Sequence, residues 1–294
     1  MKYGEIVKAV NEVLAQYTMP LTLRQVYYRL VAKLLIPNTV TAYKTLSRLL
    51  VKARERGEVD DTRIEDRSRQ VLGVGDWGRE DFDSFLNSQI EHLKDSWQYW
   101  TRKLWKNQPR NVLVAVEKDA LSRLFIDVAD KFHIHVFPTK GYGSYTYVKN
   151  MATRMNSNSE KPTIVLYFGD YDPSGRDIQR DLKERLGTYG GENFQVVRIA
   201  LTKDQIARFN LPHRPEDATT LEKLGRDPRT KTYGMEYAAE LDALEPPTLQ
   251  AMTRDAITTT IDDKKWKEDL EQIRQEQEQL KEKLKKLKIE WEED

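Results

Sequence analysis

The chain has 294 residues, a net charge of +1 and no cysteine, which excludes disulfides and thiolate metal sites. Its four histidines also argue against a structural zinc site. Charged residues make up 32% of the chain, and no apolar run approaches the roughly 20 residues of a membrane span. Residues 1–6 lack the apolar core of a signal peptide, so we expect neither export nor membrane insertion.

The first 56 residues combine helical patterning with an excess of basic charge. Apolar residues recur at helical spacing over 5–16, 23–35 and about 39–54, and Thr22 and Thr39 suit the N-caps of the last two helices. Ten basic and three acidic residues give this segment +7 and leave −6 for the remainder. The pattern predicts a helix-turn-helix or winged-helix module that binds nucleic acid. A plain helical bundle with solvated charges is the alternative.

Two rows of side chains on these helices are candidate functional residues. On the second helix Tyr27 lies within the apolar stripe, whereas Tyr28 lies off it, one turn after Arg24, on a face expected to be more exposed. On the third helix, basic residues recur every four positions along one side, and these are Lys44, Arg48, Lys52 and Arg56. We expect this basic side to contact DNA.

A connecting region follows the helical module. Residues 57–78 are polar and interrupted by glycine, which predicts a wing or a connector. Residues 79–107 carry apolar residues at helical spacing, which predicts one long helical segment. Its tryptophans favour packing in a core or between domains over a platform for base stacking, and they are Trp97, Trp100 and Trp105.

Strands and helices alternate from residue 109 onward. This alternation predicts an α/β fold with a mostly parallel, covered sheet. The predicted strands are apolar runs at 111–116, 134–137, 164–168 and 194–201. Farther along, the pattern is irregular, with helices expected at 236–244 and 249–261.

The last segment has a heptad pattern. Apolar positions alternate spacings of four and three, with the polar Gln277 at one seam position. The seam consists of Trp266, Leu270, Ile273, Gln277, Leu280, Leu284, Leu287 and Trp291. We expect a helix that pairs with a partner, with packing against its own domain as the alternative.

Three carboxylates follow two of the predicted strands. Glu117 closes one strand, and Asp170 and Asp172 close another about fifty residues later. In a doubly wound sheet, ligands bind at the carboxyl ends of the strands, so neighbouring strand ends could bring the three acids together. Carboxylate oxygens suit Mg²⁺, which is the cofactor we expect. The alternative is a polar turn and a first-turn acid favoured by the helix dipole.

Five short motifs resemble those of one protein family. They are Thr-Leu-Arg-Gln-Val-Tyr-Tyr at 22–28, Val-Glu-Lys-Asp-Ala at 116–120, Lys-Gly-Tyr at 140–142, Gly-Asp-Tyr-Asp-Pro-Ser-Gly-Arg-Asp-Ile at 169–178 and Glu-Leu-Asp-Ala-Leu at 240–244. Strand-Glu-helix followed by Asp-x-Asp looks like a Toprim domain. Together, the motifs resemble the A subunit of topoisomerase VI and the related meiotic double-strand-break protein. The chain is shorter than the usual A subunit, so it looks most like the stand-alone "mini-A" forms.

The resemblance implies a transesterification. Tyr28 would attack a DNA backbone phosphorus and become joined to the 5′ end of the cut strand, and Arg24 would stabilise the transition state. Mg²⁺ would be held by Glu117 and the Asp170/Asp172 pair, and Lys140 would contact phosphate. A free tyrosine has a pKa near 10 and so requires activation or charge stabilisation.

The resemblance also implies an assembly. A homodimer would cut both strands of double-stranded DNA, with each site shared between two subunits. Strand passage would require an ATP-binding B-type subunit, since the chain has no P-loop motif. We expect a cytoplasmic, nucleoid-associated protein with a winged-helix domain at 1–75, a connecting helix at 76–108, a Toprim domain with an extension at 109–261 and a heptad helix at 262–294. A Toprim-type hydrolytic nuclease and a non-catalytic DNA-binding protein are the alternatives.

Overall fold

The computed structural model describes residues 2–65, 81–156, 161–212, 227–235 and 238–286. The chain divides into two compact units. Unit 1 consists of Met1–Arg69 and Arg110–Thr260, and unit 2 consists of Gln70–Pro109 and Ile261–Asp294. No described helix is long and apolar enough to cross a membrane.

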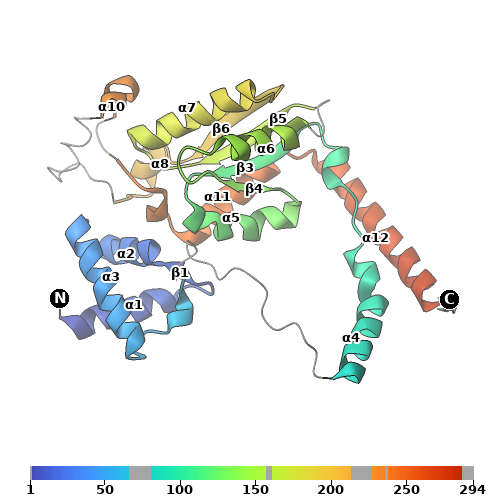
Figure 1. Cartoon of the computed structure of the whole chain (residues 1–294), viewed down its shortest axis with the longest axis horizontal. Helices are drawn as coiled ribbons and strands as arrows, with labels where there is room; N and C mark the ends of the chain where they lie inside the picture. Colours follow the sequence, from blue (N-terminus) through green and yellow to red (C-terminus); the bar gives the residue numbers. More distant parts are fainter. Residues whose placement is uncertain (1, 66–80, 157–160, 213–226, 236–237, 287–294) are drawn as a thin grey trace. The chain divides into compact units, whose positions relative to one another are not determined.

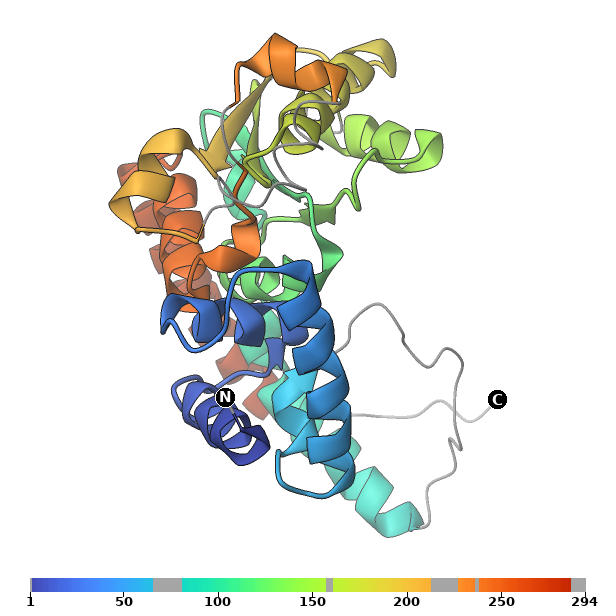
Figure 2. The ribbon, with the colours of Figure 1, turned by 90° about the vertical axis from the view of Figure 1, so that its left-hand side faces the viewer.

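Unit 1 begins with three helices, α1 (Tyr3–Ala15), α2 (Leu23–Ala32) and α3 (Val40–Glu55), which lie together in both views (Figure 1, Figure 2). As predicted, Thr22 caps α2 in a capping box with Gln25, and Thr39 caps α3. Two short strands, β1 (Leu21–Thr22) and β2 (Ile64–Glu65), pair in parallel beside the helices.

The second part of unit 1 is an α/β layer structure, as the sequence predicts. Its four-stranded sheet has the order β4-β3-β5-β6, and all pairs are parallel. The strands are β3 (Asn111–Val116), β4 (Val136–Pro138), β5 (Thr163–Phe168) and β6 (Phe194–Ala200).

Helices cover both faces of this sheet (Figure 1). On one face lie α6 (Tyr145–Asn156) and α7 (Pro173–Thr188), whose apolar side chains form a core with those of β3 and β5. On the other face, α5 (Ser122–Ala129) packs against α11 (Pro246–Thr258). Two short helices, α8 (Lys203–Arg208) and α10 (Pro228–Tyr233), complete the described helices of this part.

The segment before α11 differs from the prediction. A helix was expected at 236–244, of which 236 and 237 lie outside the described residues. The structure has only a short 3₁₀ turn, η6 (Leu241–Ala243). Before this turn, Ala239 forms an antiparallel bridge with Tyr171 at the end of the sheet. The backbone amide and carbonyl of Ala239 both bond to Tyr171, so they do not form the hydrogen bonds of a helix.

Unit 2 contains α4 (Phe82–Asp95) and α12 (Asp263–Lys285). The single helix predicted at 79–107 is wrong beyond Asp95, where two 3₁₀ turns follow, η2 (Ser96–Tyr99) and η3 (Leu104–Lys106). The heptad residue Gln277 donates to the backbone carbonyl of Trp100 at 2.9 Å, so part of the seam packs within the unit. Trp105 packs edge-to-face on Trp266, which agrees with a packing role. Seam positions 287 and 291 lie outside the described residues.

Candidate functional site

Two of the predicted acids meet at the carboxyl ends of β3 and β5. The strands are neighbours, and Val116 pairs with Phe168 at their last residues. Glu117 follows Val116 directly, and Asp170 follows Phe168 after Gly169. The Asp170 amide donates to Glu117 Oε2 at 2.9 Å. The Glu117 amide donates in turn to the Phe168 carbonyl at 2.8 Å. The parallel register therefore brings these carboxylates together, as the sequence predicts.

Two glycines leave room for this approach. A Cβ added to Gly169 would lie 2.6 Å from Glu117 Oε2. This distance is shorter than a van der Waals contact, so the Glu117 side chain would have to move. A Cβ on Gly175 would meet the Asp170 carbonyl oxygen and lie 3.0 Å from the same Glu117 oxygen. The absence of side chains at both positions allows the Glu117 carboxylate to contact the β5–α7 turn.

Asp172 has a structural role at this turn. Its Oδ1 accepts from the Gly175 amide at 2.6 Å, so it is the N-cap of α7. Its negative charge still reaches the site. Burial, the Asp170 charge and, more weakly, the Asp172 charge raise the pKa of Glu117 to about 7. The three predicted acids therefore share one electrostatic environment.

A lysine neutralises part of this acidic site. Lys118 Nζ lies 3.0 Å from Asp170 Oδ1, 3.1 Å from Glu240 Oε2 and 2.6 Å from Asp242 Oδ2. Burial works against the charge of Lys118, but the three carboxylates hold its pKa well above the ordinary value. We call Lys118, Asp170, Glu240 and Asp242 the lysine cluster.

Asp170 is the most buried of the predicted acids, at 7% exposure. Burial raises its pKa to about 6, although the charge of Lys118 opposes this effect. Its Oδ1 also accepts from the Leu241 amide at 2.7 Å. The backbone of η6 and the Lys118 side chain thus hold the Asp170 carboxylate in place.

The segment 240–245 also binds helix α2. Glu240 forms an ion pair with Arg24 of α2 and also contacts Lys118 of the lysine cluster. One turn farther along α2, Arg29 binds Glu245 at 2.8 Å and donates to the Ala243 carbonyl. Lys118, Glu240 and Asp242 have no role in the site predicted from the sequence. Their presence in the motifs at 116–120 and 240–244 was the available signal.

Tyr28 is buried, at 1% exposure, which contradicts the expectation that it lies on an exposed face of α2. Its ring packs edge-to-face against Tyr27, with centroids 5.2 Å apart. The two tyrosines, Arg24, Val40 and Tyr43 line a cavity of about 150 Å³. The helix is covered on this side because α3 and η6 both pack against α2.

A larger cleft of about 890 Å³ joins the two parts of unit 1. Arg24 lines it from α2, and Glu117, Lys118 and Asp242 line it from the sheet end and η6. Lys140 also lines it, 67% exposed and 3.2 Å from Asp119. Because Arg24 and Tyr43 line both spaces, the cavity beside Tyr28 adjoins this cleft.

The predicted basic side of α3 lies apart from the cleft lining. Lys44, Arg48 and Lys52 are exposed, whereas α3 contributes other residues to the cleft. Those residues are Tyr43, Ser47, Val51 and Arg54.

The arrangement of the acidic side chains and the comparisons with known proteins leave the metal site and the family as predictions. Within the described ranges, no three His, Cys, Asp or Glu side chains are arranged to hold one metal ion together. The carboxylates of two predicted acids bind other groups of the protein instead. Asp170 contacts Lys118, and Asp172 caps helix α7. No protein-family model matches the chain, and no curated protein matches it either.

Proposed function

We propose that the chain is a Mg²⁺-dependent DNA transesterase that resembles the A subunit of topoisomerase VI and cuts double-stranded DNA. One observation carries the proposal. The cleft brings Arg24, which lies one turn before Tyr28, to the same space as Glu117 at the acidic end of the sheet. A nucleophile, a cation and carboxylates would then act on one phosphodiester.

The chemistry of the three predicted acids suits a magnesium ion, although their side chains would have to leave their present partners to bind it together. The donor set consists of carboxylate oxygens only, and burial together with the Asp170 charge raises the pKa of Glu117 to about 7. A divalent cation would relieve this repulsion, so Glu117, Asp170 and Asp172 are the residues that would hold it. When bound, it would supply charge stabilisation for the leaving 3′ oxygen and its phosphate.

The chain's own residues would perform the remaining steps. The Tyr28 oxygen forms a bond to phosphorus as the bond from phosphorus to the 3′ oxygen breaks. The phenolic proton passes to solvent, and the leaving 3′ oxygen takes up a proton from solvent to become a hydroxyl. Arg24 would stabilise the charge on the phosphorane, and Lys140 would contact a neighbouring phosphate. Because Tyr28 is buried, α2 or its cover must move before DNA reaches the hydroxyl.

The proposed assembly is a homodimer that acts on the nucleoid in the cytoplasm. Two copies would cut the two strands, and the exposed basic side of α3 (Lys44, Arg48 and Lys52) would contact the DNA backbone. Strand passage would need a B-type ATP-binding subunit as a further partner.

The test is a search for covalent protein–DNA complexes. Supercoiled DNA is incubated with protein and Mg²⁺, the reaction is stopped with detergent, and protein-linked breaks are counted. Tyr28→Phe and Asp170→Asn should abolish them, whereas Tyr27→Phe should retain them, because Tyr27 donates to the loop at Asn38 instead. Covalent adducts that persist in Tyr28→Phe would refute the assignment of Tyr28 as the nucleophile.

A hydrolytic nuclease is the second candidate, and the burial of Tyr28 favours it. It predicts Mg²⁺-dependent breaks without attached protein and with full activity in Tyr28→Phe. DNA binding that a chelator leaves unchanged, without any cleavage, would instead indicate a non-catalytic DNA-binding protein.

A further inference from the structure

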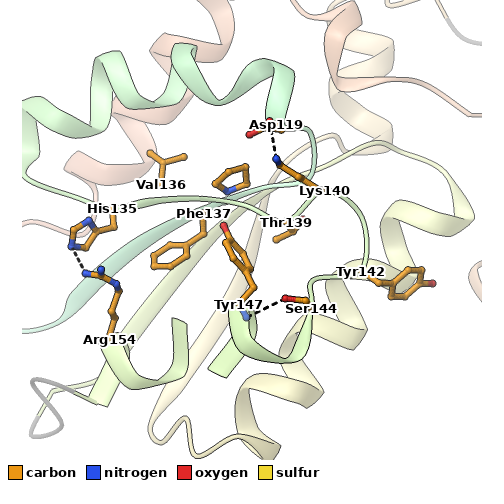
Figure 3. Close-up of a pocket in the computed structure, with 11 residues that line it drawn as sticks. Asp119, His135, Val136, Phe137, Thr139, Lys140, Tyr142, Ser144, Tyr147 and Arg154 are labelled. Carbon is orange, nitrogen blue, oxygen red and sulfur yellow. Dashed lines mark hydrogen bonds and ion pairs between the residues drawn. The ribbon is translucent and has the colours of Figure 1, made fainter. Parts of the chain in front are cut away.

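A second cavity, of about 620 Å³, adjoins the cleft. It lies between the end of β4, the loop that follows it and helix α6 (Figure 3). Asp119 and Lys140 line both spaces, so the cavity continues the proposed DNA site. Its volume is in the range of small-molecule and cofactor sites.

Tyr147 stands in the middle of this cavity, between Phe137 and Thr139 (Figure 3). Its hydroxyl is buried, and no hydrogen-bond partner for it exists among the described residues. Burial and, to a lesser extent, the Asp119 charge raise the pKa of Tyr147, so the hydroxyl keeps its proton at neutral pH. A buried donor without a partner is costly, and a ligand with an acceptor would satisfy it.

The walls of the cavity are aromatic and cationic. Phe137 and Tyr147 pack edge-to-face, with centroids 6.0 Å apart. At one end, Arg154 Nη1 lies 3.1 Å from His135 Nε2, and at the opposite end Lys140 pairs with Asp119 (Figure 3). Asp119 is the one acid among the lining residues, and Lys140 neutralises it. The cavity thus combines a flat apolar surface, a neutral donor and positive charge.

These three properties match a nucleobase that carries a phosphate. We propose that the cavity binds one unstacked nucleotide of the DNA strand whose backbone lies in the cleft, an inference that rests on the proposed function for its source of nucleotide. The base packs on Tyr147, whose ring must turn toward the cavity before its buried hydroxyl can donate to the base. The phosphate contacts Lys140, at the boundary with the cleft. Arg154 contributes charge at the other end. A free mononucleotide has the same chemistry and is the other source.

The test is fluorescence anisotropy with a labelled single strand of roughly ten nucleotides, within the usual size of such sites. EDTA is present throughout, so the measurement is independent of cleavage. Tyr147→Phe, which keeps the ring, should weaken binding about fivefold, the usual effect of losing one hydrogen bond. Arg154→Gln should also weaken it. Tyr145→Phe, an exposed tyrosine on the same helix outside the cavity lining, is the matched control and should bind as the unaltered protein does.

Competition identifies the source and chemistry of the ligand. Deoxyadenosine monophosphate should compete better than deoxyadenosine or inorganic phosphate alone, because the cavity recognises both parts. A monophosphate that competes far better than an unlabelled strand would indicate a free nucleotide and overturn the assignment to DNA. Equal binding by Tyr147→Phe and Tyr145→Phe, or equal competition by inorganic phosphate, would overturn the nucleotide site.

The two proposals fail separately. If no covalent adduct forms but Tyr147→Phe still weakens strand binding, the transesterase proposal fails and the nucleotide site stands. If adducts form with unchanged strand binding by Tyr147→Phe, the nucleotide site fails alone.

Discussion

Replacing Lys118 by methionine tests whether the lysine cluster behaves energetically as a buried group of ion pairs. The substitution keeps much of the apolar stem and removes a charge that lies within 3.1 Å of three carboxylates. Removing one partner of a buried ion pair costs about 3–5 kcal/mol, since the remaining charge stays buried. Asp170, whose pKa is already about 6, can take up a proton at neutral pH and so limits the cost. We expect a loss of about 3 kcal/mol in the free energy of unfolding at neutral pH.

Urea denaturation in EDTA measures this loss, and Lys183→Met, at an exposed lysine of α7, is the control. The loss should shrink toward about pH 5, because Asp170, with a pKa of about 6, is then protonated. Mg²⁺ should restore more stability to Lys118→Met than to the unaltered chain, because the ion can take the place of the ammonium group. A loss below about 1 kcal/mol, the value for exposed ion pairs, would show that the lysine cluster does not behave as a buried one. No added stabilisation by Mg²⁺ would argue against a cation site.

Three further predictions concern stability. The pKa of Glu117 is about 7 in the folded chain against an ordinary 4.5, so stability should fall as pH rises through this window, by up to about 3 kcal/mol. Glu117→Gln should remove that slope in denaturation series in EDTA, and an unchanged slope would contradict the shift. Arg29→Met should cost about 2 kcal/mol in urea denaturation, since Arg29 is buried and leaves the Ala243 carbonyl without its donor. Tyr147→Phe should raise the melting temperature of the ligand-free protein, because it removes a buried hydroxyl that has no hydrogen-bond partner among the described residues. A lower melting temperature would indicate that the hydroxyl does form a hydrogen bond.

The sequence predicts the convergence of Glu117 and Asp170 because local signals suffice for it. Apolar runs mark β3 and β5, the connections between them predict parallel pairing, and polar residues mark the strand ends. The α/β class follows from the same alternation. The winged-helix and Toprim assignments remain predictions, since they depend on the resemblance of short motifs.

The lysine cluster could not be predicted because it depends on long-range contacts. Glu240 and Asp242 reach Lys118 from more than a hundred residues away, after Ala239 has paired with Tyr171. No periodicity in the sequence encodes that bridge. The same segment and α3 both pack against α2, and Tyr28 is buried instead of exposed as expected. A helical pattern shows which side of a helix is apolar but not what covers its other side.

The break after α4 has a comparable cause within unit 2. The apolar spacing continues past Asp95, so local pattern alone predicts a helix. In the structure, Glu276 of α12 accepts from Trp100 Nε1 at 2.9 Å and from Arg102 Nε at 2.9 Å. These contacts, with the bond from Gln277 to the Trp100 carbonyl, use backbone and side chains in a non-helical conformation. Tertiary contacts outweigh helix propensity here, since propensities amount to less than about 1 kcal/mol per residue.

The contacts of α2 restrict how two chains could share a site. In the family that the motifs resemble, the tyrosine of one subunit acts with the metal domain of the other. In this chain Glu240 binds Arg24 of α2 and Lys118 of the sheet end at once, and Arg29 is buried against the same segment. Separation of α2 from its own η6 would break the ion pairs of Arg24 and Arg29 and expose Arg29 to solvent. An exchange in which α2 of each copy binds η6 of the other would keep every ion pair, so these contacts are compatible with a site shared by reciprocal exchange.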